Sequence, residues 1–232
     1  MLLSWNSSET AFGVALGSVV ICFTAHWIIT KRNHTSDTID SLRTIMVQRY
    51  SGLILLGIVP ALAMFLIAGW VPEQYGLAAR METEGWVWLA CLAVPFVLAG
   101  YFVSPSKDNL ARYPQVRNKQ WSRSTFVHEY SSWLLYLIGY ETLFRGILLF
   151  GSLSVMSAWS AICLMAVVNT LSHIPKGKRE TIASLPASIL FGYITLRTGS
   201  IWVACLLHWI MAVSVTWFSF RAHPDMHLAR KS

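Results

Sequence analysis

The stretch Trp133–Phe150 reads WLLYLIGYETLFRGILLF and sets one carboxylate and one guanidinium inside a long apolar run. Glu141 and Arg145 are four residues apart, which puts them on nearly the same face of a helix, with the glutamate in the favourable first position. A charged side chain at membrane depth is costly and marks a functional site by default. We therefore expect a buried ion pair, and a site built around it, at this point of the chain.

The composition of the whole chain is typical of a polytopic membrane protein. Of 232 residues, 55% are hydrophobic and only 12% are charged, with a mean hydropathy of +0.51. Crossing a hydrocarbon core of about 30 Å takes roughly 20 apolar residues in a helix, which also pairs the backbone polar groups. We predict an all-α membrane helical bundle of about seven transmembrane helices, forming one integral domain over residues 1–232: Ala11–Thr30, Leu53–Trp70, Trp86–Val103, Phe126–Phe150, Ala158–Ile174, Ile182–Leu196 and Ile201–Phe220.

The positive charges alternate between the connections of these predicted spans. Lys and Arg are scarce before the first span and in the second, fourth and sixth connections, which hold only Arg80 and Arg197. They gather in the other connections and the tail: Lys31, Arg32, Arg43, Arg49; Lys107, Arg112, Arg117, Lys119, Arg123; Lys176, Lys178, Arg179; Arg221, Arg230, Lys231. Because basic loops stay in the cytoplasm, we predict an N-terminus outside and a C-terminus in the cytoplasm.

The net charge of +7 is accordingly a signal of topology. Nucleic acid is not an expected partner, since the charges lie in the loops predicted to be cytoplasmic, beside the lipid bilayer. The four cysteines all fall in predicted spans and are expected to pack there, rather than to form a disulfide or metal framework: Cys22, Cys91, Cys163 and Cys205. The sequence gives no indication of an oligomeric state.

Few ionisable groups enter the predicted spans. Arg145 is the only basic residue placed well inside one, and Glu129 is expected near the membrane interface. Three histidines also enter apolar segments: His26, His173 and His208. His26 has no ionisable neighbour and is expected to pack, so the candidate chemistry at membrane depth comes down to Glu141, Arg145, His173 and His208.

Three motifs follow one another in the second half of the chain. They are Glu141-Thr142-Leu143-Phe144-Arg145-Gly146, then Asn169-Thr170-Leu171-Ser172-His173, then the stretch Phe191–Trp202 leading to His208. In order and spacing they resemble the CAAX protease and bacteriocin-processing (CPBP, or Abi) family, with a core over residues 125–220. The resemblance implies an intramembrane peptidase in which a glutamate and the first histidine activate water, while the last histidine and an asparagine stabilise the oxyanion.

The chain departs from the family pattern at three positions. Where the family has the first of two adjacent glutamates, this chain has Tyr140. Asn169 stands where the family has an aromatic residue, four positions before the first histidine. Ala212 stands where a polar residue is expected, four positions after the last histidine. A shift of one residue turns a helix position by about 100°, so Glu141 does not point where the first glutamate would. Tyr140, with an ordinary pKa of about 10, cannot replace a carboxylate base near neutral pH.

These observations leave several functions open. The first is an endopeptidase that cleaves a membrane-associated or lipid-anchored protein or peptide, with Glu141, His173 and His208 as catalytic residues and Arg145, Tyr140 and Asn169 in support. The second is a catalytically impaired pseudoprotease that binds or regulates a membrane partner. A small transporter with Glu141 as a proton relay is a third, although no inverted repeat supports it. We expect no cofactor: zinc could use Glu141 and the two histidines, but no HExxH-type spacing supports a metal site.

Overall fold

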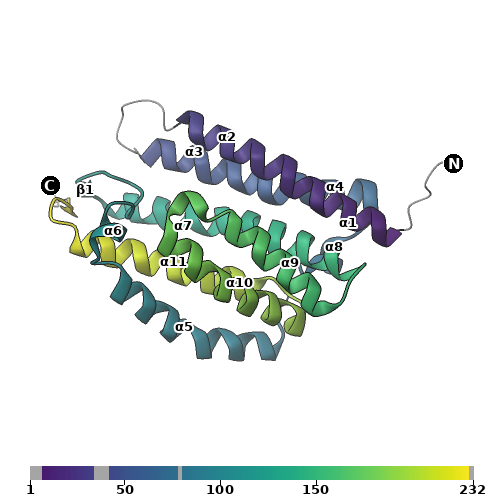
Figure 1. Cartoon of the computed structure of the whole chain (residues 1–232). Coiled ribbons are helices and arrows are strands. Elements are labelled where there is room, and N and C mark those ends of the chain that lie inside the picture. Colours follow the sequence, from purple (N-terminus) through teal and green to yellow (C-terminus); the bar gives the residue numbers. More distant parts are fainter. Residues whose placement is uncertain (1–6, 34–41, 78–79, 230–232) are drawn as a thin grey trace.

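The computed structural model describes residues 7–33, 42–77 and 80–229 of this chain. It is an all-α bundle, as the sequence predicts. The N-terminal third is a hairpin of two long helices (Figure 1), each made of α-helical segments interrupted by wider π-helical turns: α1 (Ser7–Ser18), η1 (Val19–Phe23) and α2 (Thr24–Asn33); then α3 (Leu42–Gly52), η2 (Leu53–Ile58), α4 (Val59–Ala63) and η3 (Met64–Ala68).

The remaining two thirds supply five more long helical segments and three short ones. The long segments are α5 (Thr83–Val103); α7 (Arg123–Glu141), continued by η5 (Thr142–Leu148) and α8 (Leu149–Leu153); α9 (Ala158–Leu171); α10 (Lys178–Thr198); and α11 (Trp202–Ala222). The short ones are η4 (Pro72–Tyr75), α6 (Lys107–Leu110) and η6 (Ile174–Lys176). A helix lies at each of the seven predicted spans.

The chain is an integral, multi-pass membrane protein. Five of the described helices are long and apolar enough to cross a bilayer, and Ala158–Leu171 is a shorter apolar helix. The sidedness of the two termini stays a prediction from the basic loops.

The helix from Arg123 to Leu153 is the centre of the bundle. In its most apolar window 72% of the residues are buried, against 6% for Thr83–Val103. Figure 1 shows why: the α1–α4 hairpin covers one side of this helix, α9, α10 and α11 surround it, and α5 lies at the opposite margin. A central helix has protein on every side, so its charged residues can meet partners that lipid could not provide.

Glycines bring the central helix close to the N-terminal hairpin. A Cβ atom added to Gly57 would lie 2.8 Å from the Cα of Gly139, and one added to Gly139 would lie 2.9 Å from the carbonyl oxygen of Gly52. Small residues allow such close backbone approach between membrane helices, where dispersion forces replace the hydrophobic effect. This contact sets the distance between the hairpin and the helix that carries Glu141.

The second helix begins earlier than the sequence predicts, and this corrects two expectations. It starts at Leu42 rather than Leu53, so Arg49 lies inside a membrane helix and is 2% exposed, instead of being a loop charge. Glu129, expected near the interface, is fully buried beside it. The hydropathy pattern failed here because a charge that is neutralised by a partner on another helix still counts as polar in the sequence.

A short parallel pairing closes one end of the bundle. Strand β1 (Gln120–Trp121) precedes α7, and strand β2 (His227–Leu228) follows α11. The amide of His227 donates to the carbonyl of Lys119 at 2.8 Å, and the amide of Ala229 donates to the carbonyl of Trp121 at 2.9 Å. The C-terminal segment is thereby tied to the start of the central helix.

Candidate active site

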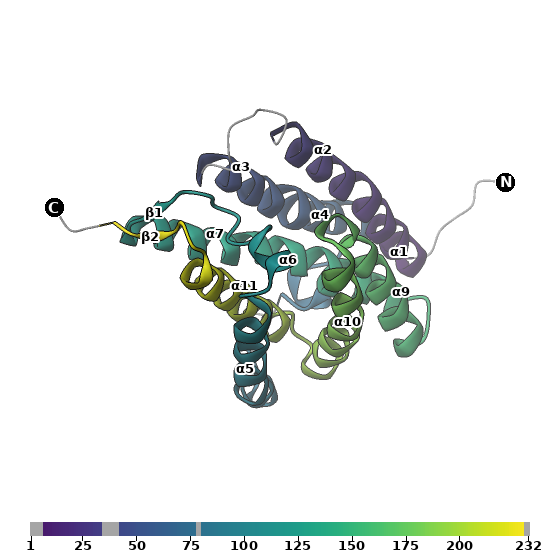
Figure 2. The same ribbon diagram turned by 60° about the vertical axis from the view of Figure 1, so that its left-hand side comes forward.

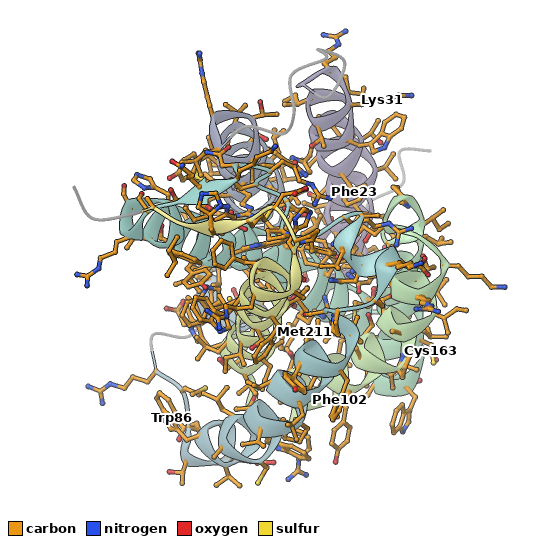
Figure 3. The ribbon with its side chains drawn as sticks, turned by 90° about the vertical axis from the view of Figure 1, so that its left-hand side faces the viewer. Phe23, Lys31, Trp86, Phe102, Cys163 and Met211 are labelled. Atoms are coloured by element: carbon orange, nitrogen blue, oxygen red, sulfur yellow. The ribbon has the colours of Figure 1, made fainter. Side chains whose placement is uncertain are left out.

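A cavity of about 480 Å³ lies between α5, α6, α7, α10 and α11. Figure 2 shows α6 lying across the end of the bundle between α10 and α11, and Figure 3 looks on to that end, with the lining residues Phe102 of α5 and Met211 of α11 labelled. Most of the wall is apolar. Four of the sequence-predicted site residues reach it as polar groups: Arg145, Asn169, His173 and His208.

Glu141 lies behind this wall and is completely buried. Its Oε1 atom is 2.7 Å from Nδ1 of His208, and its Oε2 atom is 3.2 Å from Nη1 of Arg145. The predicted pair with Arg145 is therefore present, with His208 added on the other oxygen. Among the described residues, hydrogen bonds join Glu141 to His208 and not to His173.

The contact with Glu141 fixes the proton on the ring of His208. A carboxylate accepts hydrogen bonds, so Nδ1 of His208 carries the hydrogen and donates it. Nε2 is then left with a free lone pair in the neutral ring, and His208 lines the cavity. A carboxylate behind an imidazole also stabilises the imidazolium that forms when Nε2 takes up a proton.

His173 reaches the same cavity from the connection between α9 and η6. Its Nδ1 atom is 3.0 Å from the carbonyl oxygen of Asn169, an acceptor, so this nitrogen also carries the hydrogen. Burial, and next the positive charge of Lys176, lowers the pKa of His173, so the ring is neutral at physiological pH. His173 and His208 thus share one cavity, each with Nδ1 committed to an acceptor.

Tyr140 stands at the position of the lost glutamate and points to the His173 side of the site. Its hydroxyl accepts a hydrogen bond from the Asn169 amide, lies 2.9 Å from Oγ of Ser172, and is 3.5 Å from Nδ1 of His173. The ring is edge-on to both histidines, with centroids 6.1 Å from His173 and 5.8 Å from His208. Tyr140 and Glu141 therefore serve opposite histidines, as the 100° step between them requires.

Arg145 links the glutamate to the second motif. Its Nη2 atom donates to Oδ1 of Asn169 at 3.4 Å and to Oγ of Ser188 at 3.3 Å, and its guanidinium lies over the ring of Phe191. Its Nε and Nη1 atoms are buried without a hydrogen-bond partner among the described residues. A buried donor without a partner is costly, so this incomplete pairing sets Arg145 apart from an ordinary structural arginine.

Ser172 and Ser188 complete this polar network, and sequence reasoning missed both. Ser172 directly precedes His173, and the Ser188 hydroxyl bonds Oδ1 of Asn169 at 2.5 Å. Ser188 lies two residues after Pro186, within α10, where a lone serine reads as a packing residue. The only sequence signal for Ser188 is that it lies three residues before Phe191, on the same face of the helix.

The residues present do not gather into a metal centre. Within residues 7–33, 42–77 and 80–229, no group of three or more His, Cys, Asp or Glu side chains is placed to hold a metal ion. Glu141 and His208 are together, but His173 is held by Asn169 instead.

Charged residues line the end of the cavity nearest α6. The hydroxyl of Tyr113 is 3.3 Å from Oε2 of Glu180, and Lys176 pairs with Glu180 at 3.4 Å. Burial, followed by the charge of Glu180, raises the pKa of Tyr113, so its hydroxyl is a neutral donor. Arg112, Arg179 and Asp108 also line the cavity here, so this end is polar and carries charges of both signs.

Comparison with known families identifies this region. Residues 124–214 match the family model described as type II CAAX prenyl endopeptidase Rce1-like. No curated protein and no solved structure matched the chain. The matched stretch begins at the central helix and contains all three motifs, with every candidate residue named above from Tyr140 to His208. Residues 124–214 are thus similar to the CPBP family of intramembrane proteases, with Tyr140 at the position of the first glutamate of the first motif.

Proposed function

We propose that this protein is a CPBP-type intramembrane endopeptidase that cleaves a membrane-associated or lipid-anchored protein or peptide, with its working core over residues 125–220. The observation that supports this most directly is the pair of histidines on one cavity. His173 and His208 come from different parts of the chain, yet each has Nδ1 fixed by an acceptor and Nε2 left without a partner among the described residues. An imidazole oriented by a carboxylate, as His208 is by Glu141, is a common general base.

The proposed reaction is hydrolysis of a peptide bond. A water molecule gives a proton to an imidazole Nε2 and attacks the carbonyl carbon, and the proton then passes to the leaving amine as the C–N bond breaks. Glu141 holds the ring of His208 and stabilises its protonated form, which can donate to the oxyanion. Arg145 in turn holds Glu141 at 3.2 Å. In this scheme the Glu141–His208 pair does the work that the resemblance gives to a glutamate and the first histidine.

The test is peptide cleavage by the purified protein in lipid nanodiscs. The probes are two internally quenched peptides of one sequence, with and without a farnesyl group on a cysteine near the C-terminus. We expect cleavage of at least one, and its loss in Glu141→Gln and His208→Asn. Exposed residues supply matched controls, Glu73→Gln and His128→Asn, which should keep wild-type rates. Cleavage that survives in both site variants would refute the assigned roles.

A pseudoprotease is the second candidate, and two observations favour it. The Tyr140 hydroxyl is held by Asn169 and Ser172, and Ala212 faces the cavity where a polar oxyanion partner is expected. Under this alternative neither peptide is cleaved, but the farnesylated peptide still binds. Binding measured by fluorescence anisotropy would then be unchanged in the Glu141→Gln, His173→Ala double variant.

A further inference from the structure

A second buried ion pair lies at the far end of the central helix, outside the three motifs. Nη1 of Arg49 donates to Oε2 of Glu129 at 2.8 Å, and Nη2 donates to Oε1 at 2.8 Å. The exposed fractions of the two side chains are 2% and 0%. Two parallel charge-assisted bonds fix the relative orientation of a guanidinium and a carboxylate, as well as their distance.

Further hydrogen bonds lock this pair to three parts of the chain. Nη1 of Arg49 also donates to the carbonyl of Glu129 and to Oγ of Ser132, both at 2.9 Å, and Nη2 donates to the amide oxygen Oε1 of Gln115 at 3.0 Å. Arg49 belongs to α3, Glu129 and Ser132 to α7, and Gln115 to the connection before β1. Although Nε of Arg49 has no partner among the described residues, five bonds from its two terminal nitrogens hold the network in one geometry.

Trp133 is the side chain that this network holds against the cavity. Its Nε1 donates to Oε1 of Glu129 at 3.1 Å, and the guanidinium carbon of Arg49 lies 4.1 Å from its ring centroid. The indole is thus fixed by a hydrogen bond at its edge and by a cation on its face. Trp133 lines the cavity that also contains His173 and His208.

We propose that Arg49 and Glu129 are positioning residues that hold Trp133 as a substrate-selecting wall of the cavity. This proposal deepens the proposed function and rests on it for the kinetic consequence. It also assigns a role to the N-terminal hairpin, because Arg49 lies outside the matched residues 124–214. The hairpin then shapes the site instead of only anchoring it. The ligand part that meets this wall is apolar and flat enough to pack on an indole.

The first experiment follows Trp133 directly and needs no activity. The full-length protein is labelled with 5-fluorotryptophan in nanodiscs, and the Trp133 signal is assigned by its loss in Trp133→Phe. In Arg49→Lys, which keeps the charge but loses the bidentate fork, we expect this signal to shift or broaden while most of the other tryptophan signals stay in place. Arg43→Gln is the matched control, an exposed arginine on the same helix. An unmoved Trp133 signal in Arg49→Lys would overturn the proposal.

The second experiment measures kinetics on whichever quenched peptide the wild type cleaves. We expect Arg49→Lys and Trp133→Phe to raise KM about three- to ten-fold while kcat changes less than two-fold, since the wall binds substrate but does not touch the reacting bond. A fall in kcat with unchanged KM would contradict the assigned role. If the wild type cleaves neither peptide, the proposed function fails, whereas the fluorine signal still decides whether Arg49 positions Trp133.

Discussion

Two ion pairs are buried on the same central helix, and they differ in how completely they are satisfied. Among the described residues, the terminal nitrogens of Arg49 make five hydrogen bonds, including both bonds to the Glu129 carboxylate. Arg145 meets Glu141 through one contact of 3.2 Å and leaves Nε and Nη1 without a hydrogen-bond partner, whereas Arg49 leaves only Nε without one. The chemistry of the two pairs is the same, but Glu129 is held by both arms of one guanidinium, whereas Glu141 is shared between Arg145 and His208.

The two carboxylates, of Glu129 and Glu141, also have different surroundings. The carboxylate of Glu129 faces an arginine, an indole and little else, so nothing remains to react. The carboxylate of Glu141 shares its charge between Arg145 and His208, and both of these side chains reach the cavity. In a buried setting a more completely satisfied network stabilises one geometry, whereas a less satisfied one is costly and persists where function needs it.

The largest expected effect separates the two glutamates by activity. Glu141→Gln removes the charge that supports protonated His208, so we expect kcat to fall about 10²- to 10⁴-fold, the usual contribution of acid–base catalysis. The measurement is steady-state cleavage of the peptide that wild type accepts, with folding checked by circular dichroism. A kcat within three-fold of wild type would place Glu141 with Glu129, as a structural carboxylate.

The next effect is on stability and concerns the pair of Arg49 and Glu129. Arg49→Leu leaves Glu129 as a buried charge without its partner, which costs about 3–5 kcal/mol of unfolding free energy. The double variant Arg49→Leu, Glu129→Leu removes both charges and should recover most of that loss. Thermal unfolding in detergent micelles measures both. If the single variant unfolds at the wild-type temperature, the bidentate geometry contributes nothing.

A double-mutant cycle on each pair compares them on one scale. With Arg→Gln and Glu→Gln changes, we expect a coupling energy of about 2–3 kcal/mol for Arg49–Glu129 and nearer 1 kcal/mol for Arg145–Glu141, because contacting charges couple by roughly 0.5–3 kcal/mol. The order of the two values is the prediction. Equal couplings would mean that the unpartnered nitrogens of Arg145 have no energetic consequence.

The helix between the two pairs can be displaced through Gly139. An alanine Cβ there would lie 2.8 Å from the Cα of Leu53 and 2.9 Å from the carbonyl oxygen of Gly52, so backbone must move. We expect Gly139→Ala to cost about 1–3 kcal/mol, as overpacking does. Gly17→Ala, which meets no atom within 4 Å, is the control. Thermal unfolding measures both variants. Equal unfolding temperatures for Gly139→Ala and Gly17→Ala would contradict the close helix contact at Gly139.

The smallest effect is a dependence of stability on pH. Burial lowers the pKa of His173 in the folded protein below its ordinary value of about 6.5. Below that pH the unfolded chain binds a proton that the folded chain does not, so the unfolding free energy falls as the pH is lowered. The slope between pH 6.5 and 5 should be smaller in His173→Gln by up to one proton. Denaturant titrations across this range measure it, and an identical slope would show that His173 is not protected.

The sequence predicts most of the fold because lipid enforces a simple pattern. Long apolar runs become helices, and each of the seven expected segments is one. The pair of Glu141 with Arg145 was also predictable, since four residues of helix bring them together. What could not be predicted is long-range: Arg49 meets Glu129 across 80 residues, and Glu141 chooses His208 over His173 across 67. Such contacts depend on how each helix is rotated about its own axis, and a single sequence does not specify that rotation.

The pairing of β1 with β2 has a consequence for the order in which the protein assembles. The backbone of residues 119–121 finds its partners at residues 227–229, more than a hundred positions later. The ribosome has therefore made every described helix before the β1–β2 pairing can form. A chain cut short before residue 227 keeps the helices but loses the backbone bonds that join its C-terminal segment to the start of the central helix.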